Sequence, residues 1–397
     1  MFTMRPGGPL SVFRPLLLSL LVVLMFTPLL HAQATIKVGD VNLRFGLLAQ
    51  AWGDAQQNAT PPGGYADNLF VRRIRFLVGG QINPNVSFFF ETDNPNMGKA
   101  PKALGTGFIT QDAFVEWKPT GSNAFMVDGG LMLPPLCRNC LESAATILSL
   151  DYGSYSFTES ASTQSVVGRD TGFLAKGYLA GGHFEYRAGI FQGVRQSGSR
   201  NALRTTARLS YNPWDTESGY VYPGMYFGNK RVLQFGGAID HQLDYKAYSA
   251  DAFISFPMPG AIGSKPGTSS GAVGPVGSTP TAAPPVAHDA LTGELTLLGF
   301  NGGTTFTGSA AIPEQRDATF QAGYYFANPK VMPFVRLERQ DFKASANNGR
   351  DNNRAQAGLT WFPSGFNFNV KGAYSRVAPR TGTRTNEYTV QLQFFYY

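Results

Sequence analysis

The chain has 397 residues and a formal net charge of +7, with 15% charged and 13% aromatic residues. Typical soluble proteins contain about 25% charged residues, so this composition argues against an ordinary soluble protein. Beyond residue 34 there is no run of about 18 apolar residues, and we therefore expect no transmembrane helix in the mature chain. The positive surplus is small and scattered; it is compatible with anionic solutes but does not indicate a nucleic-acid partner.

The first 34 residues have the features of an export signal. Arg5 and Arg14 supply the positive region, residues 16–26 (LLLSLLVVLMF) form an apolar core, and Ala32-Gln33-Ala34 matches a small-x-small cleavage site. We expect a cleaved signal peptide at 1–34 and a mature domain at 35–397. The alternative is an N-terminal anchor helix. Without these 34 residues the chain has 31 basic and 26 acidic residues.

Segments of about ten residues with alternating apolar and polar side chains recur along the rest of the chain, which is the pattern of barrel strands. The sixteen predicted strands are 41–52, 69–82, 85–93, 107–118, 124–133, 168–179, 182–192, 202–212, 231–241, 246–257, 288–300, 318–327, 331–342, 353–362, 366–376 and 386–397. The count is even, as in bacterial single-chain barrels, and closure would leave no exposed strand edge.

The last strand shows the alternation most clearly. Tyr388, Val390, Leu392, Phe394 and Tyr396 alternate with Thr389, Gln391 and Gln393. Successive side chains of a strand point to opposite faces, so this segment has one apolar and one polar face. We predict an all-β fold, a transmembrane antiparallel β-barrel of about 16 strands with apolar residues toward lipid. A soluble β-sandwich would use the same aromatic residues, but the export signal, the strand count and the aromatic terminus favour the barrel.

The connections differ in length on the two sides of the predicted sheet. Four tight turns rich in Pro, Asn and Gly are expected on the periplasmic side, at 83–85, 180–182, 328–330 and 363–365. Longer connections are expected outside, at 53–68, 94–106, 134–167 and 300–317. Two segments on the turn side do not fit this asymmetry: the long connection 213–230, and the Pro/Gly/Ser-rich stretch 258–287, which we interpret as a mobile insertion.

The 34-residue connection 134–167 is too long for a simple turn. Long ordered loops are usually functional, and sixteen strands enclose an aqueous channel, so we expect this loop to fold inward as a constriction. It contains the only two cysteines, Cys137 and Cys140. A thioredoxin-like motif needs a βαβ setting and a zinc site needs further ligands. A loop disulfide in an exported protein is therefore the favoured interpretation.

The alternation also assigns charged residues to the inner face of the barrel. Ten basic residues are predicted to line the lumen and contact anions: Arg44, Arg73, Arg75, Lys176, Arg187, Arg204, Arg208, Arg336, Arg354 and Lys371. Ten acidic residues share that face: Glu91, Asp93, Asp112, Glu116, Asp170, Glu185, Asp240, Asp251, Glu294 and Glu338. The densest basic point is Arg72-Arg73-x-Arg75. Facing patches of opposite sign would create a transverse field across a narrow pore. The alternative is that these charges only hydrate the channel and hold its shape.

Several short stretches together resemble the phosphate-selective porin O and P family of Gram-negative outer membranes. They are 71–80 (VRRIRFLVGG), 88–93 (FFFETD), 110–118 (TQDAFVEWK), 168–172 (GRDTG), 186–193 (YRAGIFQG), 207–215 (ARLSYNPWD) and 333–338 (PFVRLE). The resemblance implies a sixteen-stranded, usually trimeric barrel that passes anions along arginines and lysines. Arg73 and Arg75 match inward basic positions of the second-strand motif. The balanced inner charge departs from a strongly basic ladder.

These observations predict a passive porin for small hydrophilic solutes, with a preference for anions, phosphate among them. We expect the outer membrane of a Gram-negative bacterium as its location, outer-membrane lipid and small anions as its partners, and a homotrimer. The alternative is a structural or adhesive barrel with little conductance. We expect no enzyme, because His183, His241 and His288 lack the context of a catalytic triad. We also expect no cofactor and no metal site.

Overall fold

The computed structural model describes residues 34–39, 41–57, 63–99, 104, 107–163, 168–194, 202–258, 288–306 and 311–397. The chain divides into two compact units, Met1–Ala34 and Thr35–Tyr397, and the second is the one described below. The signal peptide expected at 1–34 lies almost wholly outside the described residues, as does nearly all of the insertion expected at 258–287. Among the residues described, no helix is both long enough and apolar enough to cross a bilayer.

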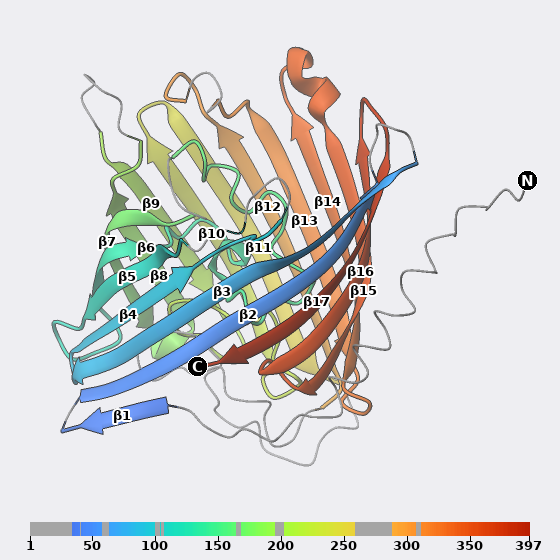
Figure 1. Cartoon of the computed structure of the whole chain (residues 1–397). Coiled ribbons are helices and arrows are strands. Elements are labelled where there is room, and N and C mark those ends of the chain that lie inside the picture. The colour runs from blue at the N-terminus through green and yellow to red at the C-terminus, as the bar shows by residue number, and fades with distance from the viewer. Residues whose placement is uncertain are drawn as a thin grey trace, which may run out of the picture. The chain divides into compact units, whose positions relative to one another are not determined.

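The second unit is a closed antiparallel β-barrel (Figure 1). Its sixteen strands are β2 (Val41–Gln57), β3 (Tyr65–Asn83), β4 (Val86–Asp93), β5 (Ile109–Trp117), β6 (Met126–Met132), β7 (Asp170–Leu179), β8 (Phe184–Phe191), β9 (Arg204–Tyr211), β10 (Val232–Gln242), β11 (Tyr245–Pro257), β12 (Ala290–Asn301), β13 (Gln315–Tyr325), β14 (Val331–Phe342), β15 (Asn352–Ser364), β16 (Phe368–Pro379) and β17 (Thr385–Tyr396). Consecutive strands pair with one another, and β17 pairs with β2 to close the cylinder. The fold class and all sixteen predicted strands are confirmed, with ends shifted by a few residues.

A few short elements accompany the barrel. The strand β1 (Ala34–Val38) also joins the sheet. Within the described residues, short 3-10 helices lie in three connections: η1 (Asn139–Leu141), η2 (Ala180–Gly182) and η4 (Ser345–Arg350). The end of β11 and the start of β12 lie at the same end of the barrel as the tight turns β3–β4, β7–β8, β13–β14 and β15–β16. The described residues contain no additional strand pair between β11 and β12.

Burial follows the two-residue period of the strands. In β14, Val335 and Leu337 are exposed on the outer face, whereas Phe334 and Arg336, which alternate with them, are buried. In β17 the exposed residues include Tyr388 and Phe394, and the buried ones are the polar residues of the inner face and Phe395. The apolar residues thus point outward and most polar residues inward, the reverse of a soluble barrel.

The C-terminal residue fills a gap on the inner face. A Cβ atom at Gly46 or Gly79 would collide with the side chain of Tyr397, and Tyr397 itself is only 4% exposed. Its ring also meets Phe89 edge-on at 6.0 Å between centroids. Glycine at these two positions on β2 and β3 therefore gives the terminal ring room to pack where the barrel closes.

In the described part of the chain, two connections fold into the barrel rather than staying at its rim, and they are visible inside the cylinder in Figure 1. We term residues 134–163 the long inner segment and residues 213–230 the short inner segment. The two pair directly: Ser143 N donates to Tyr222 O at 2.9 Å and Tyr222 N donates to Leu141 O at 2.8 Å. The connection 213–230, which did not fit the short turns expected on its side, therefore folds inward. The rings of its Tyr220 and Phe227 are buried against inward rings, Phe114 and Phe362 among them.

Candidate functional site

A β-bulge in β3 turns two consecutive arginines toward the lumen. Gln50 pairs with Arg73 and Ala51 pairs with Val71, so Arg72 is the extra residue of the bulge. A bulge residue lies outside the regular alternation of faces. As a result, Arg72 and Arg73 both reach inward, although strict alternation assigns only Arg73 to the inner face.

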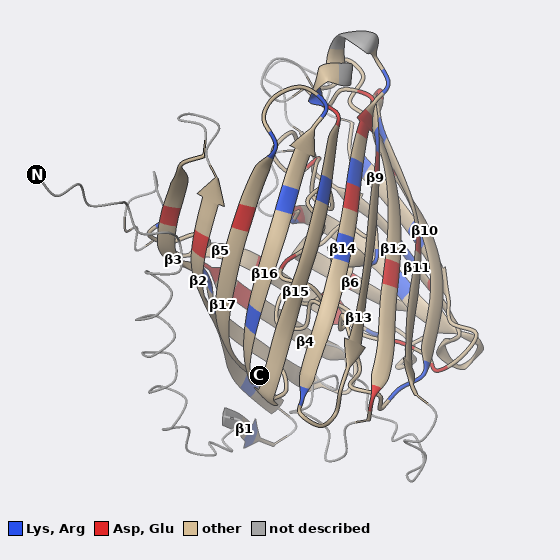
Figure 2. Cartoon of the chain, turned by 90° about the vertical axis from the view of Figure 1, so that its right-hand side faces the viewer, with Lys and Arg blue, Asp and Glu red and all other residues tan. Residues whose placement is uncertain are grey.

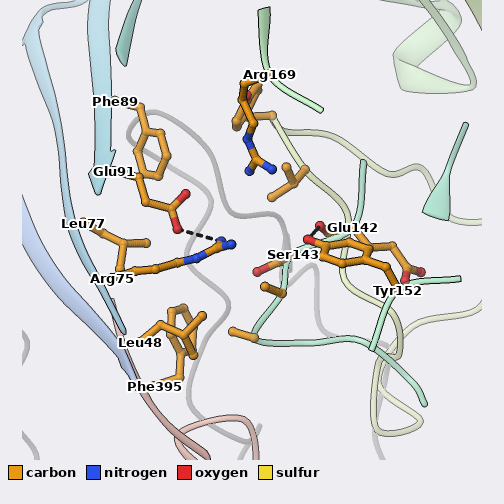
Figure 3. A pocket seen from close by; sticks show the side chains of 14 residues that line it. Leu48, Arg75, Leu77, Phe89, Glu91, Glu142, Ser143, Tyr152, Arg169 and Phe395 are labelled. Atoms are coloured by element: carbon orange, nitrogen blue, oxygen red, sulfur yellow. Dashed lines mark hydrogen bonds and ion pairs between the residues drawn. The ribbon is translucent and has the colours of Figure 1, made fainter. Parts of the chain in front are cut away.

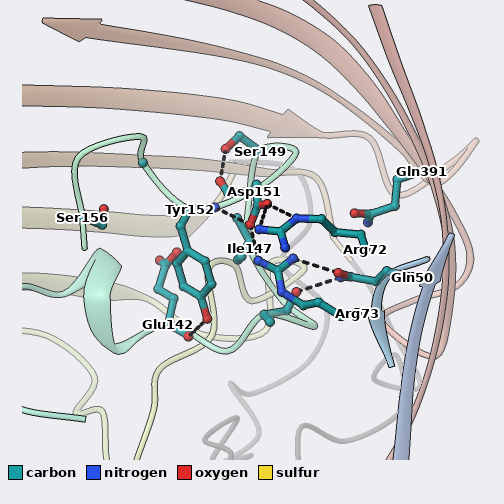
Figure 4. Close-up of polar contacts among 12 residues, drawn as sticks. Gln50, Arg72, Arg73, Glu142, Ile147, Ser149, Asp151, Tyr152, Ser156 and Gln391 are labelled. Carbon is teal, nitrogen blue, oxygen red and sulfur yellow. Dashed lines mark hydrogen bonds and ion pairs between the residues drawn. The ribbon is translucent and has the colours of Figure 1, made fainter. Parts of the chain in front are cut away.

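Both arginines bind one carboxylate of the long inner segment (Figure 4). Arg72 Nε donates to Asp151 Oδ2 at 2.9 Å, and Arg73 Nη2 donates to Asp151 Oδ1 at 2.5 Å. Burial opposes ionisation of Asp151, but the two guanidinium groups outweigh it and hold the pKa of this carboxyl below its usual value. Arg73 Nη1 also donates to Gln50 Oε1 at 2.9 Å. The carboxylate of Asp151 therefore fixes the segment to the wall formed by β2 and β3.

The adjoining wall, formed by β14 to β16, holds the same segment through its carbonyl groups. Arg336 Nη1 donates to the carbonyls of Asp151 at 2.7 Å and Tyr152 at 3.0 Å. Lys371 Nζ donates to the carbonyls of Ile147 at 2.7 Å and Ser149 at 2.6 Å. Cationic donors on β14 and β16 thus satisfy backbone acceptors that no regular structure of the segment uses. With the contacts to β3, these bonds hold the segment against the wall that runs from β14 to β3.

A second buried node lies around Arg138, which is 0% exposed. Arg138 Nη1 donates to Glu142 Oε1 at 2.8 Å, and Nη2 donates to Glu217 Oε1 at 2.7 Å. Its guanidinium lies 3.4 Å from the ring centroid of Phe253. Burial, followed by the nearby Glu294, raises the pKa of Glu142 well above its ordinary value, although Arg138 opposes this shift. The node joins both inner segments to the wall of the barrel.

The ten basic residues predicted to line the lumen all lie on its inner side, but most are buried and paired. The pairs include Arg75 with Glu91 and Asp93, Lys176 with Glu116 and Asp128, Arg187 with Glu185, Arg204 with Asp240, Arg208 with Asp251, and Arg336 with Glu338. Figure 2 shows residues of both signs on the same strands, β14 among them. These opposite charges touch along the wall, which favours the alternative that they hold the shape of the channel; the transverse field stays a prediction. Of the ten basic residues predicted to line the lumen, only Arg44 and Arg354 are partly exposed.

A cavity of about 370 Å³ lies between the inner faces of β2, β3, β14, β15 and β17 and the residues 150–157 of the long inner segment. We term it the outer cavity, because it opens among the ends of these strands that carry the longer connections. Its charged lining residues are the basic Arg72, Arg73, Lys99, Arg336 and Arg354 and the acidic Asp54, Asp151 and Glu387. Trp52, Phe70, Tyr152 and Phe157 complete much of the lining. Basic side chains therefore outnumber carboxylates five to three in this cavity.

A second, much smaller cavity of about 20 Å³ lies between β2–β4 and the inner segments (Figure 3). Arg75, Arg169, Glu91 and Glu142 point toward it, among apolar side chains such as Phe89. Tyr152 lines both cavities. The expectation of an open, water-filled lumen therefore needs correction, because apolar residues of both inner segments pack in one cluster with Leu48, Leu77 and Phe395 of the wall.

Sequence reasoning missed several residues that the structure brings into the interior. Arg169, next to β7, pairs with Asp112 at 3.0 Å, and Lys99 pairs with Asp54 at 3.1 Å. The sequence offers one local signal for Arg72, namely that it directly precedes Arg73, which was predicted to line the lumen. Cys137 and Cys140 are joined by a disulfide at the start of the long inner segment. Among the residues described, no group of three or more His, Cys, Asp or Glu side chains is placed to hold a metal ion.

Comparisons with known proteins place the fold. No protein-family model and no curated protein sequence matches the chain. Solved structures that resemble it include OmpF of Salmonella typhi in complex with daunomycin, with 13% identity and a TM-score of 0.56 over 91% of this chain and 100% of that one. An anion-selective porin from Comamonas acidovorans has 11% identity and a TM-score of 0.54 over 90% and 100%. OprB of Pseudomonas putida has 9% identity and a TM-score of 0.56 over 90% and 94%. The chain therefore has the β-barrel fold of Gram-negative outer-membrane porins.

Proposed function

We propose that the protein is an outer-membrane porin of a Gram-negative bacterium that lets small hydrophilic solutes diffuse passively, with a preference for anions. The observation that carries the anion preference is the five-to-three excess of basic side chains around the outer cavity. A cavity with a positive surplus concentrates anions and disfavours cations. The anion-selective porin among the structures of the same fold, and the resemblance to phosphate-selective porins noted above, support this proposal and make phosphate one of the anions to test.

The outer surface supports a location in a lipid bilayer. Large apolar residues are exposed there, with exposed fractions between 49% and 69%; examples are Phe76, Leu209, Ile239 and Leu337. In water these groups would be unfavourable, whereas lipid chains would cover them. The apolar face recurs on strands all round the barrel, as a transmembrane cylinder requires.

The strand lengths support a trimer that buries one wall of the barrel. The strands β4, β6, β8 and β9 have 8, 7, 8 and 8 residues, whereas a tilted strand needs about 9–11 residues to cross the apolar layer. Each strand from β10 to β17 has at least 11. We propose that the short wall β4–β9 packs against other copies, which removes its mismatch with lipid.

A second candidate function is a structural or adhesive barrel with little conductance. The burial of the inner charges favours it: Arg187, Arg204 and Lys176 are at most 2% exposed, so they offer no surface to a passing ion. The two candidates differ in whether a path leads past the long inner segment.

Planar bilayers distinguish the two. A porin gives discrete conductance steps and, in a tenfold potassium chloride gradient, a reversal potential of the sign expected for chloride. A folded, inserted protein that gives no steps, and proteoliposomes that do not swell in small sugars, would establish the non-conducting barrel.

A further inference from the structure

The lining of the outer cavity combines cations with aromatic rings. The guanidinium carbon of Arg72 lies 5.5 Å from the ring centroid of Trp52, and Lys99 Nζ lies 4.7 Å from that of Phe70. The guanidinium of Arg73 lies 5.5 Å from the ring centroid of Tyr152. An inorganic anion needs donors only and gains nothing from aromatic walls. A lining of this kind matches a solute that carries both a negative charge and a flat apolar body.

The donors for the negative charge lie on β14 and β15. Among the described residues, Arg336 Nε and Arg354 Nε are buried atoms without a hydrogen-bond partner, and Glu338 lies 3.4 Å and 3.8 Å from them. The side chain of Arg354 is 24% exposed, and its Nη2 pairs at 2.5 Å with Glu387, which is 19% exposed. A partly hydrated pair of this kind is weak, so an incoming carboxylate can compete with Glu387 for the guanidinium.

The size of the cavity fits a small organic molecule. Its volume of about 370 Å³ falls in the range of roughly 300–1,000 Å³ that holds small ligands. We propose that the outer cavity binds small aromatic carboxylates, with the carboxylate at Arg354 and the ring against Trp52 and Phe70. This inference deepens the proposed function and rests on it, because the porin supplies the route by which such a solute would cross.

Titration calorimetry on the refolded protein in detergent tests the binding without needing a current. The probes are benzoate, acetate and inorganic phosphate, each with a blank titration into detergent alone. Since an aromatic contact contributes about 0.5–1.5 kcal/mol, benzoate should bind about 3- to 10-fold more tightly than acetate. Phosphate should bind no more tightly than acetate.

Two variants and two matched controls locate the site. Arg354→Gln should weaken benzoate and acetate alike, by about tenfold or more, because a charged hydrogen bond is lost. Phe70→Leu should bring benzoate close to acetate while leaving acetate unchanged, and it keeps the bond of 2.7 Å between Trp52 Nε1 and Gln391 Oε1. The two controls are Arg339→Gln on the outer face of β14, where the side chain of Arg339 is 66% exposed, and Trp117→Leu on the outer face of β5. Both should leave the affinities for benzoate and acetate unchanged.

Several results would overturn the assignment: equal affinities for benzoate and acetate, tighter binding of phosphate than of benzoate, or an effect of Arg339→Gln as large as that of Arg354→Gln. Each variant must show the heat-modifiable mobility of a folded barrel in gels. Bilayer recordings on the same samples separate the two claims. Selective binding without conductance would refute the porin and keep the site, whereas conductance without selective binding would keep the porin and refute the site.

Discussion

Replacing Asp151 with Asn removes one negative charge from the outer cavity at the point where Arg72 and Arg73 converge. Both guanidinium groups bind this carboxylate, at 2.9 Å and 2.5 Å. Asn keeps the shape and one acceptor oxygen but not the charge. A unit charge at roughly 7 Å in a water-like medium changes the energy of a monovalent anion by ~0.6 kcal/mol, which is about a threefold change in its local concentration. Cations should be depleted by the same factor, so Asp151→Asn should make the channel more selective for anions.

The measurement is the reversal potential in a tenfold potassium chloride gradient, recorded at low total salt because screening weakens the effect. Asp341→Asn is the matched control: it removes the partner of an arginine, Arg339, at 2.6 Å, but on the exposed outer face. It should leave the reversal potential unchanged. If Asp151→Asn folds, conducts and gives the same reversal potential as the unmodified protein, then ions do not pass the outer cavity and the reasoning fails.

Three further predictions concern the interior. Lys371→Met removes the two hydrogen bonds to the carbonyls of Ile147 and Ser149, each worth about 1.5–3 kcal/mol for a charged donor. It should therefore raise the unitary conductance or its noise, whereas Lys246→Met on the outer face should not. An unchanged current would show that the long inner segment does not limit the flow of ions. Gly79→Val should displace Tyr397 and lower the stability of the barrel by about 1–3 kcal/mol, which gels would show as a lower unfolding temperature. Gly372→Val should lower the stability less, because a Cβ atom there meets nothing within 4 Å. Equal losses of stability in the two variants would contradict the packing argument. Burial, followed by Asp240, raises the pKa of Glu159 to about 7 although Arg204 opposes this; since the protonated form is the favoured one in the fold, its stabilising contribution is lost as the pH rises through about 7. The unfolding temperature should therefore fall between about pH 4.5, the ordinary pKa of a glutamate, and about pH 7, and level off at higher pH. The fall should be smaller in Glu159→Gln, and a pH dependence that survives this substitution unchanged would rule out Glu159 as its source.

The wall of the barrel could be predicted because its rule is local. A strand places neighbouring side chains on opposite faces, so Val335 and Leu337 were assignable to lipid, and Arg336 and Glu338 to the interior, from their spacing alone. The same rule gave the sixteen strands and the face of each of the ten inward basic residues. It failed at Arg72, because a bulge adds one residue and shifts the register without a marker in the sequence.

The contents of the barrel could not be predicted in this way. Alternation tells on which side Arg75 lies but not that Glu91 and Asp93 lie close enough to neutralise it, since that depends on the register between strands. The length of 134–167 indicated an inward loop, yet its contacts with β14 and β16 join residues 185 and 222 positions apart in the chain. The sequence by itself therefore determined the cylinder and its two faces, because those follow from a period of two. Only the tertiary structure decided how much of the lumen is filled and which charges stay accessible, because these depend on contacts between segments that the chain brings together only when the barrel closes.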